Sequence, residues 1–146
     1  MYFTREDIVY EGNKLCVITL QDNQTGNAGT FEELLQLWLT YEQDIEFCFL
    51  FDTRSLEKLP SITYCFKMAL FIYNLKKKGK QRLRQSTILV SKRGISRMLD
   101  LIFWIQSPVA PVLIYTTQDN FSNYHTLSIR DFNEIVLQDN MKLILP

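Results

Sequence analysis

Hydrophobic and polar positions along the chain predict strands and helices in alternation. Near the start, two β-rich runs at residues 8–10 and 15–20 flank Gly12 and Asn13, which accept the positive φ of a tight turn. This pattern predicts a β-hairpin. After a polar loop, apolar residues recur at helical spacing from Leu34 onward, so an amphipathic helix follows.

The first helix also carries a signal for where it begins. Thr30 can accept a hydrogen bond from a free amide of the first turn, and Glu33 stands three residues later. This is the spacing of a capping box, in which each side chain bonds the backbone of the other residue. We therefore expect the helix to begin directly after Thr30.

The remainder of the chain continues the alternation. An apolar run at residues 45–51, interrupted only by Glu46, is typical of a strand covered on both faces. Further elements are expected as a helix from 61 to about 78, a strand at 86–90, a helix at 95–106, a strand at 111–117 and a last helix at 128–138, with Ser128 as its cap and Asp131 in its first turn. The order β-β-α-β-α-β-α-β-α predicts one α/β domain over residues 1–146, with a mainly parallel central sheet, an antiparallel N-terminal edge strand and four helices.

The helix that begins at Ser61 is apolar on nearly all sides. One stripe, assigned to the core, contains Ile62, Cys65, Phe66, Ala69, Ile72 and Tyr73. Tyr64, Met68 and Phe71 then face away from that stripe. Because exposed aromatic and methionine side chains mark interfaces, this outward face is a candidate partner-binding surface.

Charge and composition limit the classes of function. The 16 basic and 16 acidic residues give a formal net charge of zero, which argues against a protein built to neutralise nucleic acid. The two longest apolar stretches are too short or too interrupted to span a bilayer, so no membrane insertion is expected. The N-terminus has no basic-then-apolar signal, and we expect a soluble, cytoplasmic protein.

Cysteine and histidine usage gives little support for metal or catalytic chemistry. Cys16, Cys48 and Cys65 each lie in an apolar run, which favours buried free thiols in a reducing compartment. With His125 as the single imidazole, the four ligands of a zinc site are not supplied. His125 falls in a polar loop, and no nucleophile-elbow pattern is present. We expect no catalytic residues, no metal, no cofactor and no enzymatic activity.

Asp52 stands where a ligand site would form. It ends the buried strand, and ligands of open α/β sheets bind beyond the carboxyl ends of the strands. The alternative is an aspartate that caps its own loop. On the same edge the segment SKRGISR brings cations beside a helix N-terminus, which makes a candidate anion site of Ser91, Lys92, Arg93 and Arg97.

Two other segments could attract anions. TGNAGT, residues 25–30, lies between a strand and a helix but lacks the Gly-Lys-Ser/Thr ending of a phosphate loop. KKKGKQRLR, which begins at Lys76 and ends at Arg84, holds six positive charges in nine residues. It connects a helix end to a strand start at the opposite edge of the sheet, so we expect a solvated run that satisfies the helix dipole and makes at most weak contact with anionic lipid.

The order of elements and the segment FLFDTRSLEKLPSITY resemble a STAS domain, the fold of bacterial anti-sigma-factor antagonists and of the cytoplasmic tails of sulfate transporters. The resemblance runs from DIVYEGNKLCVITLQD to PVLIYTT. It places Ser61 where the phosphorylatable serine of the family falls, after a buried strand, Asp52 and a loop of matching length. Pro60 stands where the family has an acidic residue, and Ile62-Thr63 stands in place of Ser-Gly.

The resemblance implies a non-enzymatic regulatory module. Its partner, another protein or a second copy, would dock around the helix that begins at Ser61, with Asp52, Tyr64, Met68 and Phe71 in or near the surface and Ser61 as a phosphorylation site. Lipid-binding domains of related architecture give the alternative, a protein that binds a small anionic or lipidic molecule at the carboxyl edge of the sheet.

Overall fold

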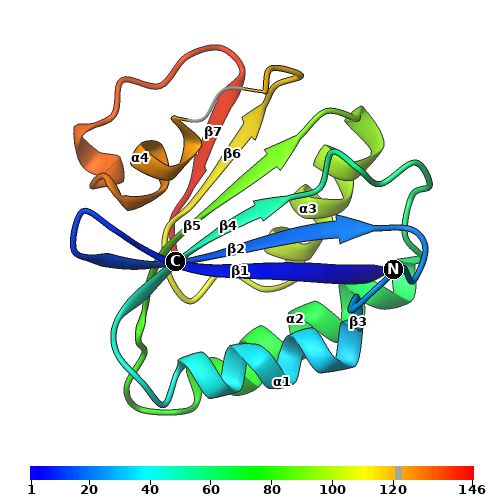
Figure 1. Ribbon diagram of the computed structural model, residues 1–146, viewed down its shortest axis with the longest axis horizontal. Coiled ribbons are helices and arrows are strands. Elements are labelled where there is room, and N and C mark those ends of the chain that lie inside the picture. The colour runs from blue at the N-terminus through cyan, green and yellow to red at the C-terminus, as the bar shows by residue number, and fades with distance from the viewer. Residues whose placement is uncertain (121–122) are drawn as a thin grey trace.

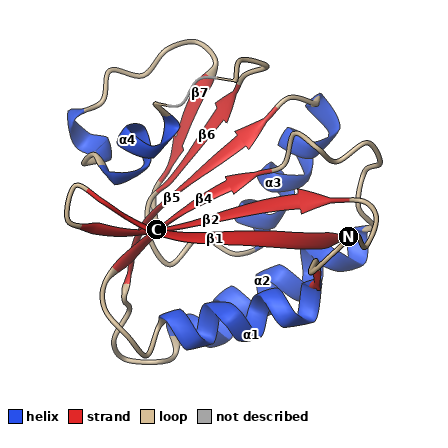
Figure 2. Ribbon diagram, viewed as in Figure 1, coloured by secondary structure: helices blue, strands red, loops and turns tan. Residues whose placement is uncertain are grey.

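The computed structural model of the protein describes residues 1–120 and 123–146. Its strands are β1 (Tyr2–Tyr10), β2 (Asn13–Gln21), β3 (Gly29–Thr30), β4 (Phe47–Asp52), β5 (Leu83–Val90), β6 (Val112–Thr116) and β7 (Met141–Ile144). Its helices are α1 (Phe31–Tyr41), α2 (Ile62–Lys76), α3 (Arg93–Ile105) and α4 (Tyr124–Ile129), followed by a 3₁₀ turn at Phe132–Glu134. Helices α1, α2 and α3 cover one face of a single sheet, and α4 covers the other (Figures 1 and 2).

The sheet has seven strands in the order β3-β1-β2-β4-β5-β6-β7. Strands β2, β4, β5 and β6 pair in parallel, while β1 pairs antiparallel with β2 and β7 pairs antiparallel with β6. The predicted α/β class, the mainly parallel centre, the antiparallel N-terminal strand and the four helices are confirmed. The sequence did not reveal β3, which pairs with the first two residues of β1 and so covers that end of the edge strand.

The turn of the N-terminal hairpin lies one residue earlier than expected. Tyr10 pairs with Asn13, so the two-residue loop is Glu11 and Gly12, with φ of 49° and 80°. Two positive φ values are the signature of the tight turn that matches strand twist, and Gly12 adopts one of them without a steric penalty. Asn13 is the first residue of β2, and its side chain donates to the Glu11 carbonyl at 3.1 Å.

The capping box of α1 is confirmed. The Glu33 amide donates to Thr30 Oγ1 at 3.2 Å, and the Thr30 amide donates to Glu33 Oε1 at 3.4 Å. Both donors would otherwise lack partners at the start of the helix. Helix α1 accordingly begins at Phe31, directly after the cap.

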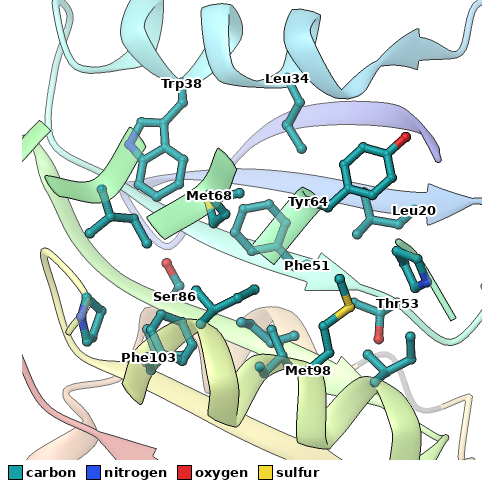
Figure 3. Close-up of a pocket in the computed structure, with 18 of the residues that line it drawn as sticks. Leu20, Leu34, Trp38, Phe51, Thr53, Tyr64, Met68, Ser86, Met98 and Phe103 are labelled. Atoms are coloured by element: carbon teal, nitrogen blue, oxygen red, sulfur yellow. The ribbon is translucent and has the colours of Figure 1, made fainter. Parts of the chain in front are cut away.

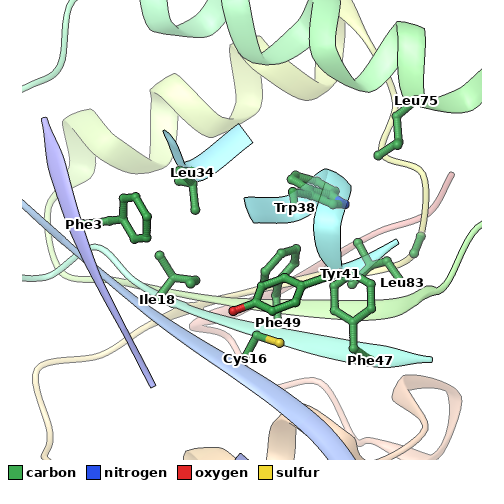
Figure 4. Close-up of a cluster of buried hydrophobic side chains, with 11 residues drawn as sticks. Phe3, Cys16, Ile18, Leu34, Trp38, Tyr41, Phe47, Phe49, Leu75 and Leu83 are labelled. Carbon is green, nitrogen blue, oxygen red and sulfur yellow. The ribbon is translucent and has the colours of Figure 1, made fainter. Parts of the chain in front are cut away.

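The core under α1 is built from aromatic side chains (Figure 4). Trp38 packs edge-on against Phe49 with ring centroids 5.1 Å apart, and Tyr41 lies 5.4 Å from Phe47. All four rings are buried. Aromatic pairs in these orientations stabilise a core by about 0.5–1.5 kcal/mol beyond their area burial, so this cluster fixes α1 against the middle of the sheet.

Among the described α-helices, α4 is the one that covers the opposite face of the sheet. Cys48 and Leu50 of β4, which alternate with the phenylalanines, pack there with Tyr124 and Ile129 of α4. Cys48 and Leu50 are at most 3 % exposed. The middle of β4 is therefore buried on both faces, as its continuous apolar run predicted.

The prediction of a helix at residues 128–138 is wrong. Helix α4 begins earlier, at Tyr124, and ends at Ile129. The Gln85 side chain donates to the carbonyls of Ser128 and Arg130, both at 2.7 Å, and so holds the backbone where the helix would have continued. Ser128 is not a cap but a fully buried residue whose hydroxyl donates to the Tyr124 carbonyl. Asp131 caps only the 3₁₀ turn, by accepting from the Asn133 amide at 3.0 Å.

The three cysteines are buried and free. Burial raises the pKa of Cys16 to about 12, and the nearby Asp7 carboxylate adds to this rise. Thiolate is the reactive form, so Cys16 is unreactive near neutral pH. Cys48 and Cys65 also have a pKa raised by burial.

Replacing Thr87 by Val should raise the free energy of unfolding by about 1 kcal/mol. Thr87 lies in β5 at 0 % exposure, and its hydroxyl has no hydrogen-bond partner among the described residues. Valine has nearly the same shape and removes the buried hydroxyl. Urea unfolding monitored by circular dichroism measures the change.

The matched control is Thr53→Val. Thr53 is also buried, but its hydroxyl donates to the Leu89 carbonyl at 2.8 Å. This substitution should lower the free energy of unfolding by about 1 kcal/mol. Equal effects of the two valines would contradict the difference in hydrogen bonding.

Candidate functional site

Helix α2 carries a stripe of exposed apolar side chains on its outer face. Its members in the helix are Ile62 (58 % exposed), Phe66 (55 %), Leu70 (60 %) and Tyr73 (48 %). Leu59 (62 %), which lies two residues before Ser61, adds to them, and we call these five residues the α2 stripe. Positions 62, 66, 70 and 73 follow each other at helical spacings of four, four and three, so they form one continuous surface. In the part of the chain that the structure describes, no helix is both long and apolar enough to cross a membrane.

The stripe is not the face that the sequence indicated. The assignment of Ile62, Phe66 and Tyr73 to the core is wrong, since all three are exposed. Tyr64, Met68 and Phe71 are half-buried and turn toward the sheet and α1. Tyr64 packs edge-on against Phe31 at 5.0 Å between ring centroids, and Phe71 lies 5.1 Å from Trp38. The assignment of these three side chains to an outward face is wrong, because α1 packs on the side of α2 that they occupy.

Helix α3 lies alongside α2 and runs in the same direction (Figure 1). Where the two helices begin, Leu59 lies close to the backbone of α3, since a β-carbon on Gly94 would be 3.5 Å from Leu59 Cδ1. At the other end, Lys76 Nζ donates to Ser107 Oγ at 2.6 Å. This end of α3 also carries Trp104, which is 83 % exposed.

Positive charge surrounds the stripe. Helix α2 contains no acidic residue, and its last turn and C-cap are Lys76 and Lys77. Lys77 Nζ lies 4.3 Å from the centre of the Tyr73 ring. At the opposite end, Arg93 and Arg97 of α3 are exposed. Lys67 is the member of this group that is neutralised within the chain, by Glu32 at 3.0 Å.

Ser61 is the N-cap of α2, as predicted. Its hydroxyl oxygen accepts from the Thr63 amide at 3.3 Å. Pro60 precedes it, and the first turn of α2 contains no acidic side chain. The Ser61 side chain is exposed and lies directly before Ile62, at the beginning of the α2 stripe.

At the carboxyl edge of the sheet, Asp52 is occupied by its own loop. Its Oδ1 accepts from both the amide and Nε of Arg54 at 3.0 Å, and its Oδ2 accepts from Arg54 Nη2 at 2.9 Å. Burial on its own raises the pKa of Asp52, but the hydrogen bonds and charge of Arg54 outweigh it and hold the pKa below its ordinary value. Asp52 therefore has the loop-capping role that was the alternative to a ligand site.

Arg54, which the sequence analysis did not single out, connects three loops of this edge. Its Nη1 donates to the Asp119 carbonyl, and its guanidinium lies 5.3 Å from the centre of the Tyr124 ring. Lys92 Nζ donates to the Arg54 carbonyl at 3.2 Å. Among the candidate anion-site residues, Lys92 is therefore bonded to the backbone of the loop that follows Asp52. Ser91 is half-buried, and Arg93 and Arg97 are exposed.

Asp22 is a second residue that sequence reasoning missed. Its carboxylate accepts from the amides of Glu57 at 2.7 Å and Lys58 at 3.3 Å. These bonds hold the loop before Ser61 against the end of β2. The sequence signal was an acidic residue two positions after the end of a predicted strand.

His125 belongs to α4 and not to a loop. Its ring packs edge-on against Tyr10 with centroids 5.8 Å apart. The neighbouring Thr126 hydroxyl lies 2.8 Å from Tyr10 Oη. These contacts join α4 to the end of β1.

The basic run at the amino edge of the sheet lines part of an open cleft of about 370 Å³. Two cations of the cleft are used within the chain. Arg84 Nη1 donates to Asn13 Oδ1 at 2.6 Å, and Lys14 pairs with Asp44 at 3.1 Å. Weak contact of this edge with anionic lipid stays a prediction.

Comparison with family models, with curated proteins and with solved structures gives no match for the chain. The resemblance to STAS domains stays a prediction that rests on the order of elements and on the segment around Ser61. The site is therefore argued from its own geometry.

Replacing Ser61 by Ala should lower the free energy of unfolding by about 1 kcal/mol, the usual loss for a helix cap. Replacing it by Asp should keep the cap and add a favourable interaction with the helix dipole, so stability should be equal or slightly higher. Thermal and urea unfolding of both variants measure this. An aspartate that destabilises as much as alanine would show that Ser61 does not act as the cap.

Replacing Asp52 by Asn should lower the free energy of unfolding by about 2 kcal/mol at pH 7, because the charged bonds to Arg54 are lost. Since the folded-state pKa of Asp52 lies below its unfolded value, its stabilisation is present above about pH 4 and disappears as the pH falls through the folded pKa. The difference between the two proteins should therefore shrink below about pH 4. Urea unfolding at pH 7, 5 and 3 gives the profile.

Asp44→Asn is the control for this profile. Asp44 is likewise in an ion pair, with Lys14, but its side chain is 61 % exposed, so the loss of this pair should change the free energy of unfolding by less than about 0.5 kcal/mol. A difference between Asp52→Asn and the parent that stays constant down to pH 3 would contradict the ionised pair.

Proposed function

We propose that the protein is a non-enzymatic interaction module that binds another protein on the outer face of α2. The observation that carries this proposal is the α2 stripe, five apolar side chains that are each about half exposed or more. Single exposed apolar residues are ordinary on protein surfaces, whereas contiguous groups of them mark interaction sites.

The stripe has the composition of an interface centre. Phe66 and Tyr73 are aromatic, and aromatic side chains dominate the binding energy of many interfaces. Complete burial of one large apolar side chain contributes about 1.5–3 kcal/mol. Each stripe side chain is already about half covered, so docking gains roughly half of that value per side chain, and this gain favours association.

The charges around the stripe favour a partner of opposite sign. The rim contains Lys76, Lys77, Arg93 and Arg97, and α2 has no carboxylate. A second copy docked through the same face would bring these cations near their equivalents, which disfavours a symmetric dimer there. The partner that fits is a different protein whose apolar surface is flanked by Asp and Glu.

The resemblance to STAS domains supports a partner-binding surface at the same place on the protein. It implies docking around the helix that begins at Ser61, and Ser61 lies between Leu59 and Ile62, the first two residues of the α2 stripe. The Ser61 hydroxyl is exposed. Phosphorylation there would add about two negative charges to the rim and so alter binding of an acidic partner.

Binding of a small anion at the carboxyl edge has less support. Asp52 and Lys92, two of the residues expected in that site, bond to Arg54 instead. Arg93 and Arg97 are exposed on α3, where they serve equally well as the rim of the α2 stripe.

Photo-crosslinking from the α2 stripe tests the proposal. A benzophenone amino acid at position 66, in cells that make the protein, should give a covalent adduct with one other protein. The same group at position 9 should not, because Val9 is 76 % exposed but lies on β1, away from α2. Leu70→Glu should reduce the adduct at least tenfold, and added salt should reduce it as well, since the rim is charged.

The control substitution is Val9→Glu, which also places a carboxylate at an exposed apolar position. It should leave the adduct unchanged. Circular dichroism should show both glutamate variants to be folded. Equal adducts from positions 66 and 9 would overturn the proposal, and an adduct only with a second copy would replace the hetero-partner by a dimer.

A further inference from the structure

An apolar cavity of about 120 Å³ lies between the sheet and the helices α1, α2 and α3 (Figure 3). The sheet contributes its floor through Leu20, Phe51, Ser86, Ile88 and Val112. Its walls include Leu34 and Trp38 of α1, Tyr64, Met68 and Ile72 of α2, and Met98, Ile102 and Phe103 of α3. Well-packed interiors contain few voids larger than a water molecule, so a cavity of this size needs an explanation.

The lining offers almost nothing to a charged or strongly polar ligand. Its polar groups are the hydroxyls of Thr53, Ser86 and Tyr64 and the indole NH of Trp38, which donates to Glu42. The Thr53 hydroxyl already donates to the Leu89 carbonyl. Ser86 lies in the middle of β5 at 4 % exposure and borders the cavity (Figure 3). An ion placed there would lose its hydration without gaining a counter-charge.

The size of the cavity defines the size of its occupant. An engineered apolar cavity of roughly 150 Å³ in another protein stays free of water and binds benzene. We propose that this cavity is a binding site for a small uncharged molecule, one aromatic ring or a short alkyl chain, in which at most one hydroxyl or carbonyl group meets Ser86.

The helix wall is suited to admit such a molecule. Met68 and Met98 project into it from α2 and α3 and are only half-buried. Methionine is unbranched and changes conformation at little cost, so these side chains can move aside without displacing a helix. The site is independent of the α2 stripe, since no stripe residue lines the cavity.

The methionines provide a direct test. The chain has four, of which Met1, Met68 and Met98 line the cavity, whereas Met141 lies in β7 and does not. In protein labelled with ¹³C at the methionine methyl groups, toluene should shift the signals of Met68 and Met98 in a saturable manner and leave that of Met141 in place. Benzoate, of similar shape but charged, should shift none of them.

A variant in which a larger side chain fills the cavity should not bind toluene. Ser86→Ile places a larger apolar side chain on the floor of the cavity and should weaken toluene binding at least tenfold. Thr87→Val is the control. Thr87 is the next residue on the strand and its side chain lies on the opposite face of the sheet, so this variant should bind toluene as the parent does. Toluene at ten times its dissociation constant should raise the melting temperature of the parent by about 4 °C. If Ser86→Ile does not fold, Val112→Ile adds a single methyl group to the same floor and should weaken binding by a smaller factor.

Three results would overturn the proposal. The first is the absence of saturable shifts at Met68 and Met98. The second is an equal shift at Met141, which would indicate unspecific partitioning. The third is undiminished toluene binding by a folded variant with the filled floor.

Discussion

The row of phenylalanines along β4 is the contact on which the arrangement of the helices depends. Phe47, Phe49 and Phe51 point to one face of the sheet, with successive ring centroids 5.1 and 4.6 Å apart. Trp38 and Tyr41 of α1 pack onto this row. Because the alternate residues Cys48 and Leu50 face α4, β4 must be covered from both sides, and only a strand inside the sheet meets that condition.

Once α1 is fixed on this row, the rotation of α2 about its axis follows. Phe71 meets Trp38 and Tyr64 meets Phe31, so that side of α2 turns inward and the side with Phe66 and Leu70 turns to solvent. Sequence periodicity could not choose between the two, because α2 is apolar on nearly all sides and either side could fill a core. The partner helix decides, and its contacts join residues about 33 positions apart in the chain.

Features that depend on neighbouring residues could be predicted, and those that depend on distant ones could not. The caps at Thr30 and Ser61 require only the next two or three residues, and both are confirmed. The end of α4 depends on Gln85, more than 40 residues earlier, whose side chain holds two carbonyls there. Strand β7 was missed for a related reason, since its four residues become a strand only by pairing with β6. The ion pair of Asp52 with Arg54 is an exception, because its partners are two positions apart and the sequence indicated only that Asp52 ends a strand.

Helix α2 has apolar surface on two sides, and this makes its two proposed roles physically separable. Its inner side, with Met68 and Ile72, lines the cavity, and its outer side, with Phe66 and Leu70, carries the stripe. A helix with so little polar surface gains weak orientation from solvation alone. The aromatic contacts with α1 supply the orientation instead, and the bond from Lys76 to Ser107 ties the end of α2 to the end of α3. A change at Leu70 can therefore alter docking without reaching the cavity, and a change at Ser86 on the sheet can fill the cavity without touching the docking surface.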